Sequence, residues 1–404
     1  MLNFKILETE VQNFIQEHLG HNLAELSLKG SPFEGIKTVE LINQIQAKLK
    51  CKKKLPKWYK TMQIFYPNKL NIEQSSSEAT AQYKNKLIGG ESLVDITGGF
   101  GVDSYYFSKK IKRIIHCEID EGLSQIASHN FKNLKAKNIE TVAKDGILFL
   151  TNSMHDFDWI YIDPSRRDEA KNKRFFIEDC HPNVDQHLNL FFKRSDNILI
   201  KLSPMLDIKA ALRELPNTKE VHVVSVKNEV KELLFILEKG FLKEVSIKAI
   251  NLNTLQPNFK FKLSEENKAD ITFQNPLKYL YEPNLALLKS GAFKTIALRF
   301  DIEKLGPHTH LYTSTKRVEN FPGNTYCIDE ILSNKKANIR KRLKGIKANL
   351  KTRNYPKTVA QIKKDLNTID GGNQYVFFTS SKSEKQILLC SKLNLNGLNV
   401  TTTG

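Results

Sequence analysis

Between residues 91 and 240, short apolar stretches typical of strands alternate with stretches typical of helices. The candidate strands are LVDIT (93–97), IIHCEI (114–119), ETVAK (140–144), WIYID (159–163), NILIKL (197–202) and VHVVSV (221–226). Such alternation indicates a parallel sheet covered by helices on both faces. Only a short polar link at residues 227–229 follows the sixth stretch, so we expect a hairpin that inserts one antiparallel strand.

Three glycines follow the first candidate strand within four positions, in TGGFGVD. In a doubly wound sheet the ligand lies beyond the carboxyl ends of the strands, at the point where the strand order reverses. Residues without a Cβ let the backbone pass close to a ligand, so Gly98, Gly99 and Gly101 predict a ligand-binding loop. Glycine turns also occur as plain connectors, and the loop alone therefore identifies no ligand.

Acidic residues stand at the ends of the next three candidate strands. Glu118, which lies 17 positions after Gly101, stands where an acid accepts hydrogen bonds from a ribose diol. Asp145 is placed to receive an adenine amino group or a bound water, and Asp163 closes the fourth strand in WIYIDPSRRD. Each acid alone is more often a cap or turn residue. Together they are expected to meet at one edge of the sheet, which favours a binding site.

Two cofactors compete for such an edge. A nicotinamide dinucleotide requires G-x-G-x-x-G, but Asp103 stands at the position of the third glycine. S-adenosylmethionine carries no pyrophosphate and requires only close backbone approach and an acid before the turn, which Asp95 supplies for the aminoacyl group. The sequence therefore predicts S-adenosylmethionine, and a dehydrogenase is a distant alternative.

Composition restricts the partner and the compartment. The chain has 62 Lys and Arg against 44 Asp and Glu, which gives a formal net charge of +18. This charge favours a polyanionic partner such as nucleic acid. Alternatively, it reflects a generally basic surface that binds no particular partner. Charges near the amino terminus exclude a secretory signal, and no apolar run approaches the roughly 18 residues that span a bilayer. The five scattered cysteines support no disulfide framework and no metal site, so we expect a soluble cytoplasmic protein.

Several motifs of this chain resemble those of one family. VDITGGFGVD resembles motif I of the class I S-adenosylmethionine-dependent methyltransferases, HCEID resembles their ribose-binding acid, KDG their adenine-contacting motif and DPSRRD their motif IV. The flanking stretches LNIEQSSSEATAQYK, IKLSPMLDI, YLYEPNLALLKSG, FPGNTYCIDE, KTRNYPKTVAQIKKDL and DGGNQYVFFT are similar to those of the bacterial members with a carboxyl-terminal THUMP-like domain. The resemblance covers most of the chain from about residue 70 onward.

This resemblance implies an α/β fold with a Rossmann-like, seven-stranded class I methyltransferase sheet. We expect a helical amino-terminal domain over residues 1–70, the methyltransferase domain over 71–243, an α+β ferredoxin-like module over 244–320 and a THUMP-like domain over 321–397. Alternating stretches at 245–252, 295–300, 375–380 and 385–393 are expected to supply the strands of the carboxyl-terminal modules. The residues expected to bind the cofactor are Asp95, Thr97, Gly98, Gly99, Gly101, Asp103, Glu118, Ile119, Asp145, Gly146 and Asp163. The stretch EQSSSEATAQYK is either a cap that closes over the cofactor or a linker.

The candidate catalytic residues are those of the motif IV match, Asp163, Pro164, Ser165 and Arg166. Methyltransferases that modify exocyclic amines carry a motif resembling [DNS]-P-P-[YF], in which the polar residue accepts hydrogen bonds from the amine and the aromatic residue stacks on the base. Ser165 and Arg166 depart from that pattern and remove the aromatic residue. Arg166 and Arg167 are expected either to bind a phosphate or a guanine edge or to pair with nearby carboxylates, and Lys201 is either a phosphate contact or a solvated lysine.

Positive charge concentrates in residues 334–364, a stretch without Asp or Glu that we expect to present its charge on a helix. Such a stretch is typical of a contact with a phosphate backbone, although a solvated helix face has the same composition. The THUMP-like resemblance favours RNA, because THUMP domains are RNA-binding modules. The expected RNA contacts here are Arg340, Lys341, Arg342, Lys344, Lys347, Arg353 and Tyr355, of which Arg353 and Tyr355 are expected to stack on exposed bases.

The sequence therefore predicts an enzyme that transfers a methyl group from S-adenosylmethionine to a base of structured RNA, transfer or ribosomal. Asp163 would orient the acceptor, and the base would be extruded from its helix to reach the cofactor. Two alternatives stay open. In the first, the acceptor is a protein or a small molecule. In the second, the chain is a non-catalytic RNA-binding protein with a methyltransferase fold.

Overall fold

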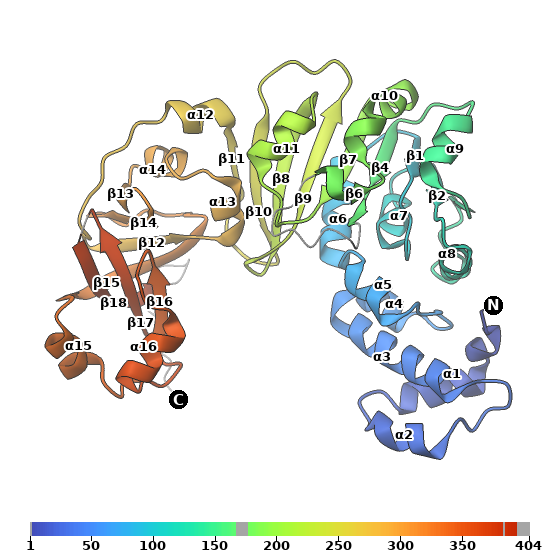
Figure 1. Ribbon diagram of the computed structural model, residues 1–404, viewed down its shortest axis with the longest axis horizontal. Coiled ribbons are helices and arrows are strands. Elements are labelled where there is room, and N and C mark those ends of the chain that lie inside the picture. Colours follow the sequence, from blue (N-terminus) through green and yellow to red (C-terminus); the bar gives the residue numbers. More distant parts are fainter. Residues whose placement is uncertain (1, 167–176, 383, 394–404) are drawn as a thin grey trace. The chain divides into compact units, whose positions relative to one another are not determined.

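The computed structural model describes residues 2–166, 177–382 and 384–393, and Figure 1 labels most of their elements. The chain forms two compact units. The first holds Met1–Lys219 and Glu232–Lys243, and the second holds Glu220–Lys231 and Glu244–Gly404. The chain passes from one unit to the other in two consecutive strands, β8 (Thr218–Val226) and β9 (Glu229–Glu238), which a turn at Lys227 and Asn228 joins.

Short helices open the first unit. They are η1 (Phe4–Leu7), α1 (Thr9–Glu17), α2 (Leu23–Lys29), α3 (Thr38–Lys54), α4 (Pro56–Lys60), α5 (Lys69–Gln74) and α6 (Glu78–Leu87). Trp58 of α4 is fully buried, and its ring lies edge-on to that of Tyr105 with 4.8 Å between the centroids. The same apolar cluster contains Leu41 of α3 as well as Ile126 and Phe131 of a later helix. These helices therefore pack on the domain that follows them.

A mostly parallel sheet forms the centre of the first unit. Its strands are β1 (Ser92–Asp95), β2 (Arg113–Cys117), β3 (Ile139–Val142), β4 (Trp159–Ile162), β7 (Asn197–Leu202) and β9, in the order β9-β7-β4-β1-β2-β3. Neighbouring strands from β7 to β3 are parallel, whereas β9 is antiparallel to β7. The inserted antiparallel strand predicted from the sequence is confirmed. Because the chain leaves β1 toward β2 and returns to its other side as β4, the strand order reverses at β1 and β4.

The helices that connect these strands are α7 (Val102–Phe107), α8 (Glu121–Asn133), α9 (Gly146–Asn152), α10 (Val184–Arg194) and α11 (Ile208–Glu214). A short pair of strands, β5 (Ser165–Arg166) and β6 (Cys180–His181), and the 3-10 turn η2 (Ile177–Asp179) lie between β4 and α10. Strands β1, β2 and β4 are buried along almost their whole length, as expected of a parallel sheet covered on both faces. The α/β fold predicted from the sequence is confirmed.

The second unit begins with the strands β8, β10 (Ser246–Leu252) and β11 (Phe259–Lys262), of which β10 is parallel to β8 and antiparallel to β11. Its helices are α12 (Leu263–Lys268), α13 (Leu285–Ser290), α14 (Thr295–Phe300), α15 (Lys336–Leu343) and α16 (Val359–Leu366). A further sheet has the order β13-β14-β12-β15-β18-β17-β16. Its strands are β12 (Tyr279–Pro283), β13 (Glu303–Gly306), β14 (Thr309–Ser314), β15 (Gly323–Ser333), β16 (Asn349–Arg353), β17 (Gln374–Ser381) and β18 (Glu384–Leu393).

Two sequence-based expectations about the second unit are wrong. The stretch TIALRF (295–300), expected as a strand, is helix α14, in which Ile296 is buried and Leu298 is exposed. Six residues are too few to fix a helical or a strand period. The basic stretch 334–364, expected as a helix, contains α15, β16 and α16. Gly345 follows α15 with a φ of +73°, a conformation that favours glycine and interrupts the helix.

A buried carboxylate links an inner strand of this sheet to its edge strand β16. Glu282 of β12 is 4% exposed, and it pairs with Lys351 and with Arg353 (2.8 Å to Nη2), both of β16. Three strands separate β16 from β12 in the sheet order, so the sheet curls and brings its edge strand β16 close to β12. Burial alone would raise the pKa of Glu282, but Lys351 and Arg353 outweigh burial and hold the pKa below its ordinary value of 4.5.

We expect Glu282→Gln to lower the free energy of unfolding of the second unit by about 2 kcal/mol, because two cations then lose their carboxylate but keep some access to water. A depressed carboxyl pKa contributes stability above the unfolded pKa and loses it as the pH falls through the folded value. Urea unfolding at neutral and acidic pH should therefore show a difference between wild type and Glu282→Gln that shrinks below about pH 4.5. Glu384→Gln, at an exposed position of β18, is the control. Equal effects of the two changes would contradict the pairing.

No helix in the described part of the chain is long and apolar enough to cross a membrane.

Candidate active site

The glycine loop joins β1 to α7 at the point where the strand order reverses. Gly98 N donates a hydrogen bond to Cys117 O (2.8 Å), which holds the loop against the end of β2. A Cβ at Gly98 would overlap the buried ring of His116, and Gly101 has a φ of +82° and faces the Phe131 ring. The loop therefore keeps its shape only with glycine at these two positions.

Glu118 follows β2 and braces this loop. Its Oε2 accepts a hydrogen bond from Gly99 N (2.7 Å), and its Oε1 accepts one from Asp120 N (2.8 Å). Asp120 in turn caps α8 by accepting from Leu123 N (2.8 Å). The next residue after Glu118, Ile119, is 69% exposed although it is large and apolar. The predicted ribose-binding acid, Glu118, thus lies directly against the glycine loop and next to the solvent-exposed apolar side chain of Ile119.

The loop after β3 lies at the same edge of the sheet and contacts the loop after β1. Asp145 caps α9 by accepting a hydrogen bond from Leu148 N (2.9 Å), and Leu148 is 57% exposed. A Cβ at Gly146 would overlap the carbonyl oxygen of Ile96, so the loops after β1 and β3 are in contact. The predicted adenine-contacting residues Asp145 and Gly146 are therefore at the carboxyl edge of the sheet.

Two of the predicted cofactor-binding acids lie in the interior. Asp95, which is 1% exposed, accepts hydrogen bonds from Thr97 N (3.1 Å) and Ser104 Oγ (2.6 Å). Ser104 Oγ is also hydrogen-bonded to the ring of His116 (3.0 Å). Asp103 is 7% exposed and belongs to a separate polar cluster. A contact of Asp95 or Asp103 with a cofactor stays a prediction.

Asp163 closes β4 and is held from two sides. Its carboxylate pairs with Lys201 of β7, and its backbone N–H donates to Thr97 Oγ1 (2.7 Å). Burial alone would lower the pKa of Lys201, but the carboxylates of Asp163, Glu232 and Asp103 raise it, so Lys201 stays charged. Lys201 is thus engaged by a carboxylate, which argues against a phosphate contact.

The residues after Asp163 are only partly described. Pro164 follows directly, and Ser165 of β5 is exposed, with its hydroxyl 3.4 Å from the carbonyl of His181. The backbone of Arg166 pairs with Cys180, whereas its side chain, like the whole of Arg167, lies outside the described residues.

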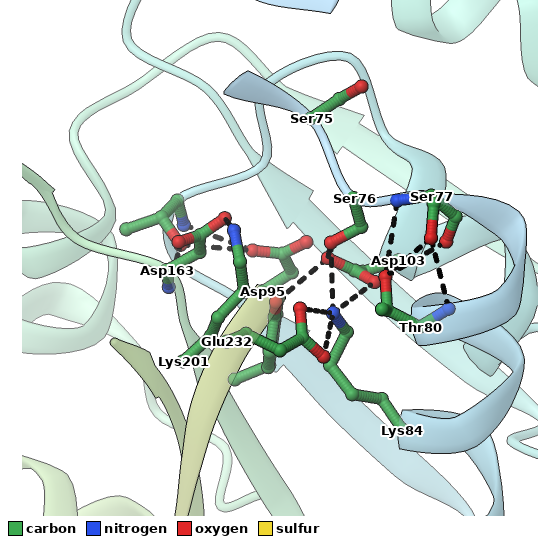
Figure 2. Close-up of polar contacts among 12 residues, drawn as sticks. Ser75, Ser76, Ser77, Thr80, Lys84, Asp95, Asp103, Asp163, Lys201 and Glu232 are labelled. Atoms are coloured by element: carbon green, nitrogen blue, oxygen red, sulfur yellow. Dashed lines mark hydrogen bonds and ion pairs between the residues drawn. The ribbon is translucent and has the colours of Figure 1, made fainter. Parts of the chain in front are cut away.

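A buried charge cluster lies beneath this edge (Figure 2). Lys84 of α6 is 0% exposed and contacts Asp103 Oδ1 (3.1 Å), Glu232 Oε2 (2.9 Å) and Ser76 Oγ (2.9 Å). Asp103 Oδ2 also accepts hydrogen bonds from Ser76 Oγ (2.7 Å) and Tyr161 Oη (2.8 Å). The cluster connects α6, α7, β4 and β9 in the protein interior.

The two carboxylates of this cluster respond differently to burial. Burial would raise the pKa of Asp103, but Lys84 and Lys201 outweigh it and lower the pKa. Burial dominates at Glu232 and raises its pKa despite the same two lysines. Lys84 and Glu232 were not among the residues predicted from the sequence. Glu232 had a signal, because it begins the otherwise apolar run ELLFIL, whereas Lys84 looks like any lysine of an exposed helix.

The predicted RNA contacts of the second unit divide into two groups. Arg340, Lys341, Lys344 and Lys347 are exposed, and no carboxylate pairs with them among the described residues. Arg342 is exposed but pairs with Glu330 (2.8 Å). Arg353 pairs with Glu282 inside the curled sheet. Tyr355 donates to Asn334 Oδ1 (2.7 Å), and its ring packs on Phe378. Arg353 and Tyr355 thus both have partners within the second unit, and their stacking on exposed bases stays a prediction.

Comparison with solved structures identifies the family. A methyltransferase candidate from Porphyromonas gingivalis W83 is 30% identical, with a TM-score of 0.87 over 98% of this chain and 100% of that chain. The chain belongs to this methyltransferase family. Within it, residues 89–244 match the spermine/spermidine synthase domain family, residues 279–322 a ferredoxin-like domain and residues 323–392 a THUMP domain-like family. The methyltransferase family with a carboxyl-terminal THUMP-like module, predicted from the motifs, is confirmed.

More distant solved structures are similar to only a part of this chain. An rRNA methylase from Streptococcus thermophilus is 15% identical over 40% of this chain and 93% of that chain, with a TM-score of 0.29. A methyltransferase candidate from Streptococcus mutans, in complex with SAH, is 13% identical over 40% of this chain and 96% of that chain, with a TM-score of 0.30. No curated protein matches the chain.

Proposed function

We propose that the protein transfers a methyl group from S-adenosylmethionine to a base of structured RNA, transfer or ribosomal. The observation that carries the cofactor assignment is the bond from Gly99 N to Glu118, because it places a carboxylate and a glycine loop together at the reversal of strand order. Beside them, the exposed apolar side chain of Ile119 offers a face for a flat ring. A side chain at Gly98 or Gly146 would collide with neighbouring atoms, so both positions require glycine. Loops without side chains at these positions let their backbone come close to a ligand.

In this proposal Glu118 accepts hydrogen bonds from the ribose, and Asp145 with Ile119 and Leu148 borders the adenine. The cofactor supplies a methyl group that its sulfonium already activates. The protein therefore contributes positioning and charge. Asp163 is suited to orient an acceptor amine or hydroxyl, because Lys201 and Thr97 fix the carboxylate and the backbone at the end of β4.

The charge of the second unit supports RNA as the acceptor. Arg340, Lys341, Lys344 and Lys347 lie on α15 and the turn after it, exposed and without carboxylate partners in the described chain. Cations of this kind bind a phosphate backbone by releasing its counterions. The THUMP-like match over the same residues supports this assignment.

Calorimetry with S-adenosylmethionine tests the cofactor site. We expect micromolar binding that Glu118→Gln weakens about tenfold, because one charged hydrogen-bond acceptor becomes neutral. Glu140→Gln, on an exposed side chain of β3, should leave the affinity unchanged. Transfer of a labelled methyl group to cellular RNA then tests the acceptor. It compares the wild type with a variant in which Arg340, Lys341 and Lys344 are replaced by Gln. Failure to bind the cofactor would exclude S-adenosylmethionine-dependent methyl transfer. Methylation of protein but not of RNA would exclude RNA as the acceptor.

A further inference from the structure

The second unit contains a cavity of about 290 Å³. It lies between the turn after β10, the segment before β15 and the paired ends of β15 and β18. The polar residues that line it include Gln256, Arg317, Asn324 and Lys392. Its volume is near the lower end of the roughly 300–1,000 Å³ usual for small-molecule sites, which suits a ligand of about one nucleotide.

Lys392 lines this cavity and has no counterion among the described residues. It is partly buried on β18, directly opposite Tyr326 of β15. In the part of the chain that the structure describes, no acceptor lies within hydrogen-bond or ion-pair distance of its amine. Burial, and then repulsion by Lys351, lower the pKa of Lys392. A partly buried ammonium without a partner is costly, and an anion in the cavity would remove that cost.

The nearby carboxylates do not supply that anion. Glu282 already accepts from Lys351, Arg353 Nη2 (2.8 Å), Tyr326 Oη (3.1 Å) and Asn324 Nδ2 (3.3 Å), so both of its oxygens are occupied. The carboxylate that does line the cavity, Glu319, belongs to an exposed residue. The charge of Lys392 is therefore left for a ligand.

We propose that this cavity binds the phosphate group of a ligand of nucleotide size, with Lys392 and Arg317 as the cations that receive it. A guanidinium and an ammonium in the lining of one cavity suit phosphate, since the first offers a planar pair of donors and the second a compact charge. Amide and hydroxyl groups from Gln256, Asn324 and Thr325 line the remainder and suit a sugar or a base edge. The site goes beyond methyl transfer and does not depend on it, because all its residues belong to the second unit.

The phosphate can come from a free mononucleotide or from the phosphorylated end of an RNA, and matched probes separate these sources. Calorimetry on the full chain would compare inorganic phosphate, UMP, uridine, and the RNA trimers pUpUpU and UpUpU. We expect UMP to bind at least tenfold more tightly than uridine, and Lys392→Met to weaken UMP binding at least tenfold. Lys385→Met, at an exposed position of the same strand, should leave it unchanged. A preference for pUpUpU over both UMP and UpUpU would identify an RNA end as the source, and equal or tighter binding of UMP a free nucleotide.

Binding of uridine as tight as that of UMP would overturn phosphate recognition. No binding of any phosphate-bearing probe, or UMP binding that Lys392→Met leaves intact, would overturn the site. Arg317→Gln provides a second variant if Lys392→Met does not fold, and it too should weaken UMP binding at least tenfold. Binding of S-adenosylmethionine, measured on the same samples, is expected to persist in both variants. The failure of this proposal and the failure of the methyltransferase assignment are thus distinguishable.

Discussion

Replacing Lys84 with methionine is expected to lower the free energy of unfolding of the first unit by about 3–5 kcal/mol, the usual result of removing one partner of a buried ion pair. Methionine keeps the length and apolar stem of lysine but leaves Glu232 and Asp103 without their shared cation. Both carboxylates are almost fully buried, so water cannot replace the lost contacts. Urea unfolding followed by circular dichroism measures the loss.

The control for this change is Lys86→Met, two residues along the same helix at an exposed position. It should change the free energy of unfolding by less than about 0.5 kcal/mol. The loss in Lys84→Met should also be smaller at acidic pH, because protonation of Glu232 and Asp103 removes the uncompensated charges. The double variant Lys84→Met/Glu232→Met should recover part of the loss. A Lys84→Met protein as stable as wild type would show that the cluster contributes nothing to stability.

Asp163→Asn is expected to reduce methyl transfer at least about 100-fold while changing the affinity for S-adenosylmethionine less than threefold. Losses of this size are usual when a charged group that interacts with the acceptor in the transition state is removed. Asparagine has nearly the same shape and keeps one acceptor oxygen, but it lacks the charge. Lys201 would still face Glu232 and Asp103, so we expect the variant to fold. Single-turnover transfer of a labelled methyl group to RNA, beside calorimetry of the cofactor, measures the two effects.

Two further variants show whether Asp163 acts on the acceptor or only supports the fold. Asp196→Asn, at an exposed carboxylate that pairs with Lys239, should behave as wild type. Lys201→Met should lower the rate less than Asp163→Asn, because it leaves the carboxylate in place but removes the group that orients it. Unchanged methyl transfer by Asp163→Asn would refute the role of Asp163 in orienting the acceptor.

The strands β4 and β7 of the first unit could be predicted because each is a largely apolar run between turns. NILIKL became β7 without a change of bounds, and WIYID differs from β4 by one residue. The helix α14 could not be predicted, because the six residues TIALRF fit either period and only burial of Ile296 against exposure of Leu298 distinguishes them. The edge at which we propose that the cofactor binds could be predicted from strand topology, since the carboxyl ends of parallel strands meet.

The partners of the charged side chains could not be predicted. Arg353 was predicted to be an RNA contact, and nothing in the local sequence indicated that the curl of the sheet brings it to Glu282, 71 positions earlier in the chain. Lys201 was expected either to bind substrate phosphate or to be solvated, but Asp163 engages it. In both cases the pairing depends on how strands that are distant in sequence are placed, and a local pattern carries no information about that distance.

The sequence by itself determined the parallel sheet, the glycine loop and the acidic strand ends, because periodicity, turn chemistry and strand direction are local properties. Only the tertiary structure decided which of these acids face the open edge and which are neutralised inside. Glu118 meets Gly99 at the edge, whereas Asp103 lies against Lys84, and Lys84 reaches Glu232 across 148 positions of chain. The cost of burying a charge depends on its surroundings, and those are complete only when the chain has folded.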